Sequence, residues 1–206
     1  MLNVYQINMM PLGRSFFARP SLQVAPDLLG CMLVHYTSEG VLSGIIVETE
    51  SYGGINDPAS HAFKGKRTAR NEVMWGPAGH AYIYLIYGIH LCFNVVTGQD
   101  GDPQGVFIRA VEPRLGMKIM ARERNISLDR NNIRKLANGP SKLCTAFCIT
   151  KDMYGTDVTS APLFFTAGED VDIVTSDRIG IDYAGNGANW PWRFLVKDSP
   201  YISRKA

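Results

Sequence analysis

One run in the sequence reads Val41-Leu42-Ser43-Gly44-Ile45-Ile46-Val47-Glu48-Thr49-Glu50-Ser51-Tyr52, an apolar segment with β-branched residues that ends in alternating carboxylates. Such composition is typical of a β-strand. A second apolar run, Cys31–Tyr36, precedes it, and the tetrapeptide Thr37-Ser38-Glu39-Gly40 between the two runs is typical of a hairpin. These residues therefore predict two antiparallel strands, with the carboxylates near the far end of the second strand.

Further elements are predicted on both sides of this hairpin. The patterns indicate helices at Leu22–Leu29, Leu115–Arg124 and Ser141–Cys148, and strands at Ala81–Ile86, Ile89–Val96 and Val106–Glu112. Gly30 is predicted to end the first helix and Pro113 the last of these strands. Short strands joined by Gly, Asp and Asn turns are expected over Ala161–Ile202. Because no βαβ alternation is visible, we expect an α+β fold around a largely antiparallel, curved sheet with flanking helices and a protruding hairpin.

Length and composition indicate one ordinary globular domain over residues 1–206, with 46% apolar and 19% charged residues. The net charge of +2 is compatible with nucleic acid but does not require it. The polar segment Gly53–Asn71 is predicted as a long functional loop, and Gln99–Gln104 and Asn125–Asn138 as flexible stretches. Residues 1–6 do not resemble a signal peptide, and no apolar run has the length of a membrane span.

The cysteines suggest a reducing compartment. All four lie within apolar runs and lack Cys-x-x-Cys or Cys/His spacing: Cys31, Cys92, Cys144 and Cys148. We therefore expect reduced thiols, no zinc or other metal site, and a cytoplasmic protein, associated with the nucleoid if the source is bacterial.

The end of the Val41–Tyr52 run carries the first candidates for chemistry. Because side chains alternate across a strand, Glu48, Glu50 and Tyr52 share one face. Two carboxylates so close repel each other unless they are solvated or paired, and in a cleft this raises at least one pKa and favours a general base or acid. A sheet face wetted by solvent explains the same pattern. Spacing alone does not choose between the two glutamates.

Arg109 stands inside the apolar strand Val106–Glu112. A buried guanidinium needs a partner, and a carboxylate is the usual one. The arginine forms either a structural ion pair, with Glu112 or with one of the glutamates of the Val41–Tyr52 strand, or a contact that orients a carboxylate and a water molecule. The sequence leaves both interpretations open.

The segment Tyr82–His90 predicts a hairpin with an unusual tip. Two-residue turns normally carry polar residues such as Asn-Gly, whereas this turn carries Tyr87 between isoleucines at positions 86 and 89. A bulky apolar tip is expected only where something covers it, either another part of the protein or a stack of bases. In the second case, stacking walls for an extruded base are available in Tyr52, His61 and Tyr84.

Two basic clusters complete the set of candidates. One follows His61 and contains Lys64, Lys66, Arg67 and Arg70; the other contains Arg114, Lys118, Arg122 and Arg124. Charge runs are usually solvated faces. A basic loop beside an aromatic tip and a carboxylate strand is nevertheless the combination expected for phosphate contacts around a base pocket.

Together these residues resemble the alkyladenine (3-methyladenine) DNA glycosylase family, from Phe16-Phe17 to Ser199-Pro200-Tyr201. The most specific blocks are Val47–Tyr52, Tyr84–Gly88, Val106–Pro113 and Gly139–Cys144. Four ordered blocks with compatible separations make a chance match improbable. The length is similar to that of compact bacterial members.

The resemblance implies a catalytic centre and a base pocket. Glu50 matches the general base, and Arg109 and the main-chain carbonyl of Ile179 match the groups that hold the carboxylate and the attacking water. Glu48 is left with a structural role. The pocket walls would be Tyr52, His61, Tyr84 and Asn94, the last of which clashes with the exocyclic amine of ordinary guanine.

The resemblance also implies how the protein meets its substrate. Tyr87 matches the residue that fills the gap left in the duplex. Contacts to DNA phosphates are implied for Lys66, Arg67 and Lys142. Ile89, His90 and Trp75 depart from the family pattern, which affects the expected substrate range and the efficiency of base flipping rather than the chemistry.

The implied activity is that of a monomeric, cofactor-free DNA repair enzyme acting on double-stranded DNA with a damaged base. It would hydrolyse the N-glycosidic bond of a purine of the 3-methyladenine, hypoxanthine, ethenoadenine and 7-methylguanine class. Because no lysine accompanies Glu50 in its motif, no Schiff-base step and no strand cleavage are expected. The alternatives are a non-catalytic nucleic-acid-binding module with the same basic loop and aromatic hairpin, and a small-molecule hydrolase that uses the paired carboxylates without DNA.

Overall fold

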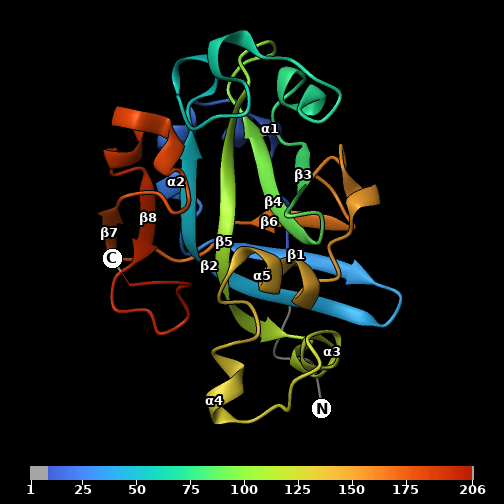
Figure 1. The fold of residues 1–206 in the computed structure, drawn as a ribbon. Helices are drawn as coiled ribbons and strands as arrows, with labels where there is room; N and C mark the ends of the chain where they lie inside the picture. Colours follow the sequence, from blue (N-terminus) through green and yellow to red (C-terminus); the bar gives the residue numbers. More distant parts are fainter. Residues whose placement is uncertain (1–8, 206) are drawn as a thin grey trace.

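Strand β2, Gly40–Tyr52, is the long central strand of the sheet (Figure 1). The computed structural model describes residues 9–205. The expectation that residues 1–6 carry no signal peptide lies outside that range. Strand β1, Met32–Thr37, pairs antiparallel with β2 across a tight turn, which confirms the predicted hairpin.

The sheet has the order β3-β4-β5-β2-β1-β6. The other strands are β3, Ala81–Ile86, β4, His90–Thr97, β5, Gln104–Leu115, and β6, Leu163–Thr166. Strand β8, Arg193–Val196, pairs with the far half of β2, and β7, Ile173–Ser176, pairs with β8. All pairings between these strands are antiparallel and the sheet curls, as Figure 1 shows, which confirms the predicted fold class.

Strands β2 and β5 approach each other closely and irregularly. Their register shifts between Ser43 and Gly44, where a Cβ on Gly44 would lie only 2.4 Å from Cγ1 of Val111. The residue there must therefore be glycine. The prediction that Pro113 ends the strand is wrong, because β5 continues to Leu115. Pro113 lies opposite Gly44 at the register shift, the kind of place where a strand tolerates a residue without an N–H.

In the described part of the chain, five short α-helices accompany the sheet: α1, Arg14–Phe17, α2, Ser21–Asp27, α3, Met117–Glu123, α4, Arg130–Ile133, and α5, Pro140–Ala146. In the view of Figure 1, α2 packs behind β2 and β5, and α5 packs in front of β4 and β5. Gly30, with a φ of 82°, follows α2 as predicted. The stretch Asn125–Asn138, which was predicted to be flexible, contains helix α4. The side chain of Asp129 caps the first turn of this helix and stabilises it.

The packing fixes which face of β2 carries the carboxylates. Thr49 donates a hydrogen bond to the carbonyl of Ala25 in α2 at 2.8 Å, and Ser51 donates to Ser21 at 2.8 Å. Glu48 and Glu50 therefore point to the opposite side of the strand, as the predicted alternation requires. The main apolar core includes Phe17, Leu28, Ile108, Phe147 and Phe165, all fully buried.

Several of the remaining connections contain 3-10 turns. The predicted loop Gly53–Asn71 contains η1, Gly54–Asn56, and η2, Phe63–Gly65, and is followed by η3, Glu72–Trp75. Among the short C-terminal strands the structure adds η5, Asp182–Asn189, which the sequence did not predict. The four cysteines are free thiols, three of them buried. Within residues 9–205, no helix is both long and apolar enough to cross a membrane.

Candidate active site

Glu50 is fully buried near the end of β2 and is held by two hydrogen bonds and an ion pair. The N–H of Ile179 donates to Oε1 at 2.8 Å, and the hydroxyl of Tyr52 donates to Oε2 at 2.9 Å. Nη1 of Arg109 lies 3.2 Å from Oε1. The Glu50 carboxylate therefore accepts two hydrogen bonds and faces the positive charge of Arg109, and these contacts fix its orientation.

Glu48 is also buried, but its contacts are with the frame of the protein. Its Oε1 accepts from Nε of Arg109 at 2.8 Å, from Nε of Arg193 at 2.9 Å and from the hydroxyl of Ser203 at 2.7 Å. The N–H of Ser203 donates to Oε2 at 2.5 Å. Through these hydrogen bonds, Glu48 links β2 to β5, to β8 and to the C-terminal segment.

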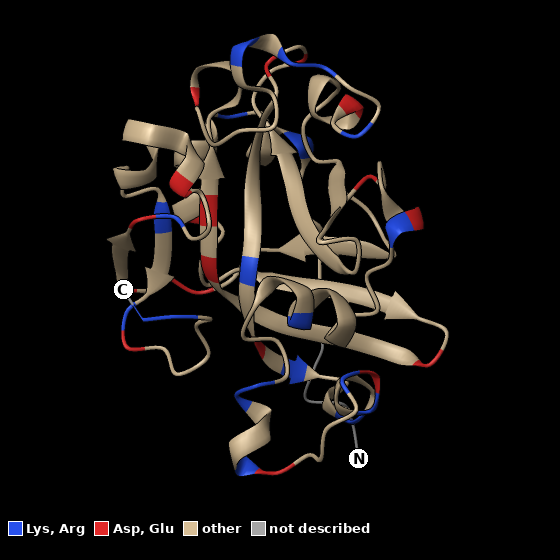
Figure 2. Ribbon diagram, viewed as in Figure 1, with Lys and Arg blue, Asp and Glu red and all other residues tan. Residues whose placement is uncertain are grey.

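The two carboxylates are balanced by arginines on both sides. Figure 2 shows acidic positions on β2 flanked by basic positions on β5 and β8. Burial would raise the pKa of Glu48, but the charge of Arg109 and hydrogen bonds from Ser203 and Arg109 hold that pKa below its ordinary value. The sequence argument that crowding raises a carboxyl pKa therefore fails for Glu48, because it could not include the arginines. Glu112, the other partner considered for Arg109, instead pairs with Arg114.

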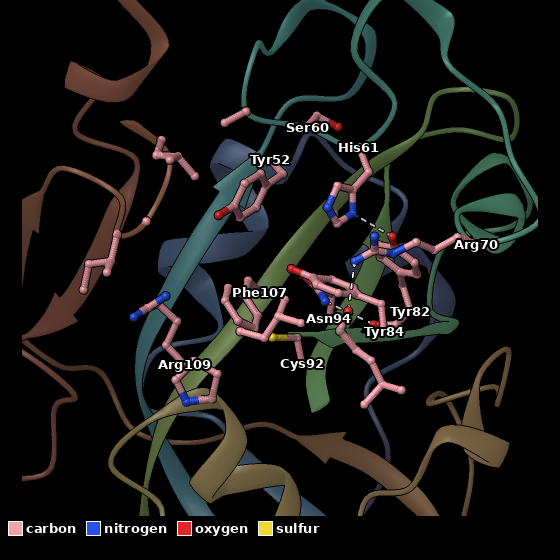
Figure 3. A pocket seen from close by; sticks show the side chains of 18 of the residues that line it. Tyr52, Ser60, His61, Arg70, Tyr82, Tyr84, Cys92, Asn94, Phe107 and Arg109 are labelled. Carbon is pink, nitrogen blue, oxygen red and sulfur yellow. Dashed lines mark hydrogen bonds between the residues drawn. The ribbon is translucent and has the colours of Figure 1, made fainter. Parts of the chain in front are cut away.

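A cavity of about 570 Å³ opens beside this cluster (Figure 3). The three residues that hold Glu50 form part of its wall, while Glu50 itself has no exposed surface. On the other side the rings of His61 and Tyr84 meet edge to face, with centroids 4.7 Å apart. The size is that of a small-molecule site, and aromatic walls suit a flat ring.

His61 is positioned through Tyr82, whose hydroxyl lies 2.7 Å from Nδ1 of the imidazole. Burial and then the charges of Arg70 and Lys66 lower the pKa of His61 to about 4. The imidazole is therefore neutral at neutral pH, and its Nδ1 can accept a hydrogen bond from Tyr82. The side-chain amide of Asn94 donates to the carbonyl of Tyr82 at 3.1 Å, which joins the floor of the cavity to the same strand.

The tip of the β3–β4 hairpin is exposed at the mouth of the cavity. Tyr87 is 89% exposed and Ile89 74% exposed, so no described part of the chain covers the tip. Tyr87 and Gly88 both have left-handed backbone conformations, with φ of 51° and 73°, as a tight hairpin turn requires. The side chain of Tyr87 also lines the cavity. Its insertion into DNA stays a prediction.

The basic clusters differ in how they are paired. Arg67 forms a close ion pair with Glu72 at 2.5 Å, and Nζ of Lys142 donates to the side chain of Asn138 at 2.9 Å. Arg70 lies over the ring of Tyr84, 4.9 Å from its centroid, and lines the cavity. In the second run, Arg122 is bound by Glu39 and Glu123. No group of three His, Cys, Asp or Glu side chains in residues 9–205 is placed to hold a metal ion.

The sequence of the whole chain can be compared with known families. A model of the methylpurine-DNA glycosylase family matches residues 15–200. The chain belongs to this family. The resemblance carried by the four motif blocks is thereby confirmed.

Relatives in this glycosylase family match over almost the full chain. A protein of Desulfitobacterium hafniense (strain Y51) is 48% identical over 200 residues, which cover 94% of this chain and 98% of that protein. A protein of Methanocella arvoryzae is 50% identical over 197 residues, 95% of this chain and 96% of that protein. Both carry the name "Putative 3-methyladenine DNA glycosylase".

In this member of the glycosylase family, the structure gathers most of the predicted site residues around one cavity. Its wall contains Tyr52, His61, Tyr84, Asn94, Arg109 and Ile179, with Glu50 directly behind. The contact that Ile179 makes with Glu50 uses its N–H, whereas the predicted contact used its carbonyl. Lys66, Arg67 and Lys142 lie outside the wall, and their phosphate contacts stay predictions.

The sequence reasoning missed several residues of the site. Arg178 and Asp57 form a fully buried ion pair beside Glu50, and Arg193 completes the charge balance at Glu48. A local signal pointed to Arg178 alone: the charged Asp177-Arg178 pair immediately before Ile179. Tyr82 was also missed, although its place two residues before Tyr84 on β3 puts both rings on one face.

Proposed function

We propose that this protein is a DNA repair glycosylase that extrudes a damaged purine from duplex DNA and hydrolyses its N-glycosidic bond, leaving an abasic site. The names of its relatives support action on 3-methyladenine. Hypoxanthine, 1,N6-ethenoadenine and 7-methylguanine are further purines of the proposed class. The observation that carries the proposal is the position of Glu50, buried directly behind the wall of an aromatic cavity whose mouth bears the exposed Tyr87.

The proposed chemistry follows from this position. Cleavage of the N-glycosidic bond passes through a transition state with oxocarbenium character, and a nearby carboxylate can stabilise that charge and activate water. Because Glu50 has no exposed surface, water must reach it from the cavity between Tyr52, Arg109 and Ile179. Arg109 and Ile179 both bind Oε1, so they orient the carboxylate while it takes the proton from the water.

The proposed reaction is hydrolysis without strand cleavage. A lyase step would require an amine that attacks the sugar and forms a Schiff base. Among the described residues that line the cavity, none is a lysine. The proposed nucleophile is therefore the water that Glu50 activates, and the expected product is an intact strand with an abasic site.

The test is incubation with duplex oligonucleotides that contain 3-methyladenine, hypoxanthine or 1,N6-ethenoadenine, followed by measurement of free base and alkali-labile sites. Glu50→Gln should lower the release rate by about 100-fold or more while duplex binding is retained, since loss of a general base costs at least that much. Glu39→Gln, which alters an exposed carboxylate on the β1–β2 turn, is the matched control and should keep the wild-type rate. No release by the wild-type protein from any of the three lesions would refute the proposal and, with duplex binding retained, would favour the non-catalytic DNA-binding module. Equal release rates in wild type and Glu50→Gln would refute the role of Glu50 as the general base.

A further inference from the structure

A buried ion pair near the cavity joins Arg178 and Asp57. Nη1 of Arg178 lies 2.5 Å from Oδ2 of Asp57, and Nη2 lies 2.8 Å from Oδ1. Both side chains are fully buried. This two-pronged geometry fixes the guanidinium plane relative to the carboxylate.

Each member of the pair also binds main-chain groups. Arg178 donates to the carbonyl of Ser51 at 2.9 Å and to that of Gly187 at 3.2 Å. Asp57 accepts from the N–H of Gly53 at 3.0 Å and from that of Ala59 at 3.0 Å. The pair therefore joins the end of β2, the loop after it and the segment that contains η5.

These three segments carry the groups of the proposed reaction. Ser51 stands between Glu50 and Tyr52, and Ile179 directly follows Arg178. The guanidinium of Arg178 also lies over the ring of Tyr52, with its central carbon 4.8 Å from the ring centroid. A shift of the pair would move the Ile179 N–H relative to the Glu50 carboxylate and the Tyr52 ring relative to the cavity.

We propose that Arg178 and Asp57 are a positioning pair, which holds the N–H of Ile179 on the carboxylate of Glu50 and the ring of Tyr52 at the cavity wall. The inference rests on the proposed glycosylase function and adds to it the residues that preserve the geometry of the reaction. Neither side chain of the pair lines the cavity, so the effect passes through Ile179, Ser51 and Tyr52.

A role in stability alone accounts less well for these contacts. A buried ion pair pays a large desolvation cost, and apolar residues of similar volume often stabilise a protein as well or better. An apolar residue in place of Arg178 would lose the hydrogen bonds to the carbonyls of Ser51 and Gly187. Moreover, a hydrogen bond to an ionised carboxylate favours that form, so loss of the Ile179 bond must change the pH dependence of a reaction that uses the carboxylate.

The experiment measures single-turnover release of 1,N6-ethenoadenine from a duplex across the acidic and neutral pH range, with duplex affinity and unfolding temperature followed in parallel. The variants are Arg178→Lys, Arg178→Met and Asp57→Asn. Arg14→Met is the matched control, because Arg14 forms another Arg–Asp pair, with Asp157, and does not line the cavity.

The expected result is a rate loss of about 100-fold in Arg178→Met, the scale of a small misplacement of reacting groups, and a smaller loss in Arg178→Lys. In both, the acidic limb of the pH–rate profile should move to higher pH. Because Arg178→Lys keeps the charge, a shift in that variant reports the position of Ile179 rather than the electrostatic field. Duplex affinity should change little.

The proposal is overturned if the acidic limb stays in place in Arg178→Lys and in Asp57→Asn, whatever their unfolding temperatures, or if Arg14→Met moves the limb equally. Should Arg178→Met fail to fold, Asp57→Asn preserves the shape of the side chain and decides the question. Failure of the wild-type protein to release any base would refute the proposed function, and the positioning pair with it; retained wild-type activity with unshifted variants would refute the pair alone.

Discussion

The imidazole of His61 is the residue whose protonation should couple most directly to the stability of the cavity. Burial and the charges of Arg70 and Lys66 lower its pKa from 6.5 to about 4. A lowered pKa in the folded state means that the unfolded chain binds more protons between these two values. The contribution to stability is therefore present above pH 6.5 and lost as the pH falls through about 4.

Replacing His61 by Gln should remove this pH dependence. From pH 7 to pH 4.5, the free energy of unfolding of the wild type should fall relative to His61→Gln by on the order of 2 kcal/mol. Denaturant unfolding at several pH values measures the difference. His90→Gln, on the exposed hairpin, is the control and should fall in parallel with the wild type. Parallel curves for His61→Gln would show that the imidazole does not titrate in this way.

At the residue scale, the sequence could predict what a short stretch of chain determines. Strand alternation placed Glu48 and Glu50 on one face, and the apolar surroundings of Arg109 required a carboxylate partner. The choice of Glu50 as the general base needed the family resemblance, since alternation treats both glutamates alike. The Arg178–Asp57 pair spans 121 residues of sequence, and no local pattern links two such charges.

The β3–β4 hairpin shows at the element scale how a turn can conflict with its own sequence. Its turn geometry favours Asn-Gly, yet the first position is Tyr87 with a φ of 51°. A bulky residue in this conformation costs on the order of 1 kcal/mol or more, and such strain is often kept at functional sites. The exposed ring gains no packing in return within the described chain.

Tyr87→Asn should therefore separate folding from function. We expect equal or higher stability, by up to about 1 kcal/mol, because Asn accepts the left-handed conformation. Release of a damaged base from duplex DNA should fall well below the wild-type rate, whereas non-specific duplex affinity should change little. Unfolding curves and single-turnover assays measure the two effects. Equal losses of base release and of affinity would argue against a wedge.

The elements themselves were predicted more reliably than their ends. The hairpins and the helices near Leu22, Leu115 and Ser141 were found where periodicity and Gly/Pro signals placed them. Strand β5 overran its predicted end because the tolerance for Pro113 comes from the opposite strand, at Gly44. The sequence could not predict that β2 pairs with both β1 and β8, since β8 is more than 140 residues away along the chain.

Some arginines and lysines of the molecule are paired with carboxylates and others are not, and the net charge of +2 does not show this difference. Arg114 and Arg122 are neutralised by Glu112 and by Glu39 and Glu123. In contrast, Arg124 binds the carbonyl of Leu136 and Lys142 binds the side chain of Asn138, so the segment between α4 and α5 gathers cations. Burial and the charges of Arg124 and Lys135 lower the pKa of Lys142. A phosphate group placed there would relieve this repulsion.

The salt dependence of duplex binding should reveal which of these charges meet DNA. Each phosphate neutralised by a cation contributes about −0.9 to the slope of log affinity against log salt concentration. Replacing Lys142 and Lys135 together by Gln should therefore make the slope less steep by about 1 to 2. Lys142 belongs to α5, whose first residue, Pro140, lines the cavity, and Lys135 is near enough for its charge to act on Lys142. Arg122→Gln removes the same type of charge from a paired site and should leave the slope unchanged. If instead the slope responds to Arg122→Gln and not to the lysine variant, duplex DNA lies along α3, and the predicted phosphate contact of Lys142 is wrong.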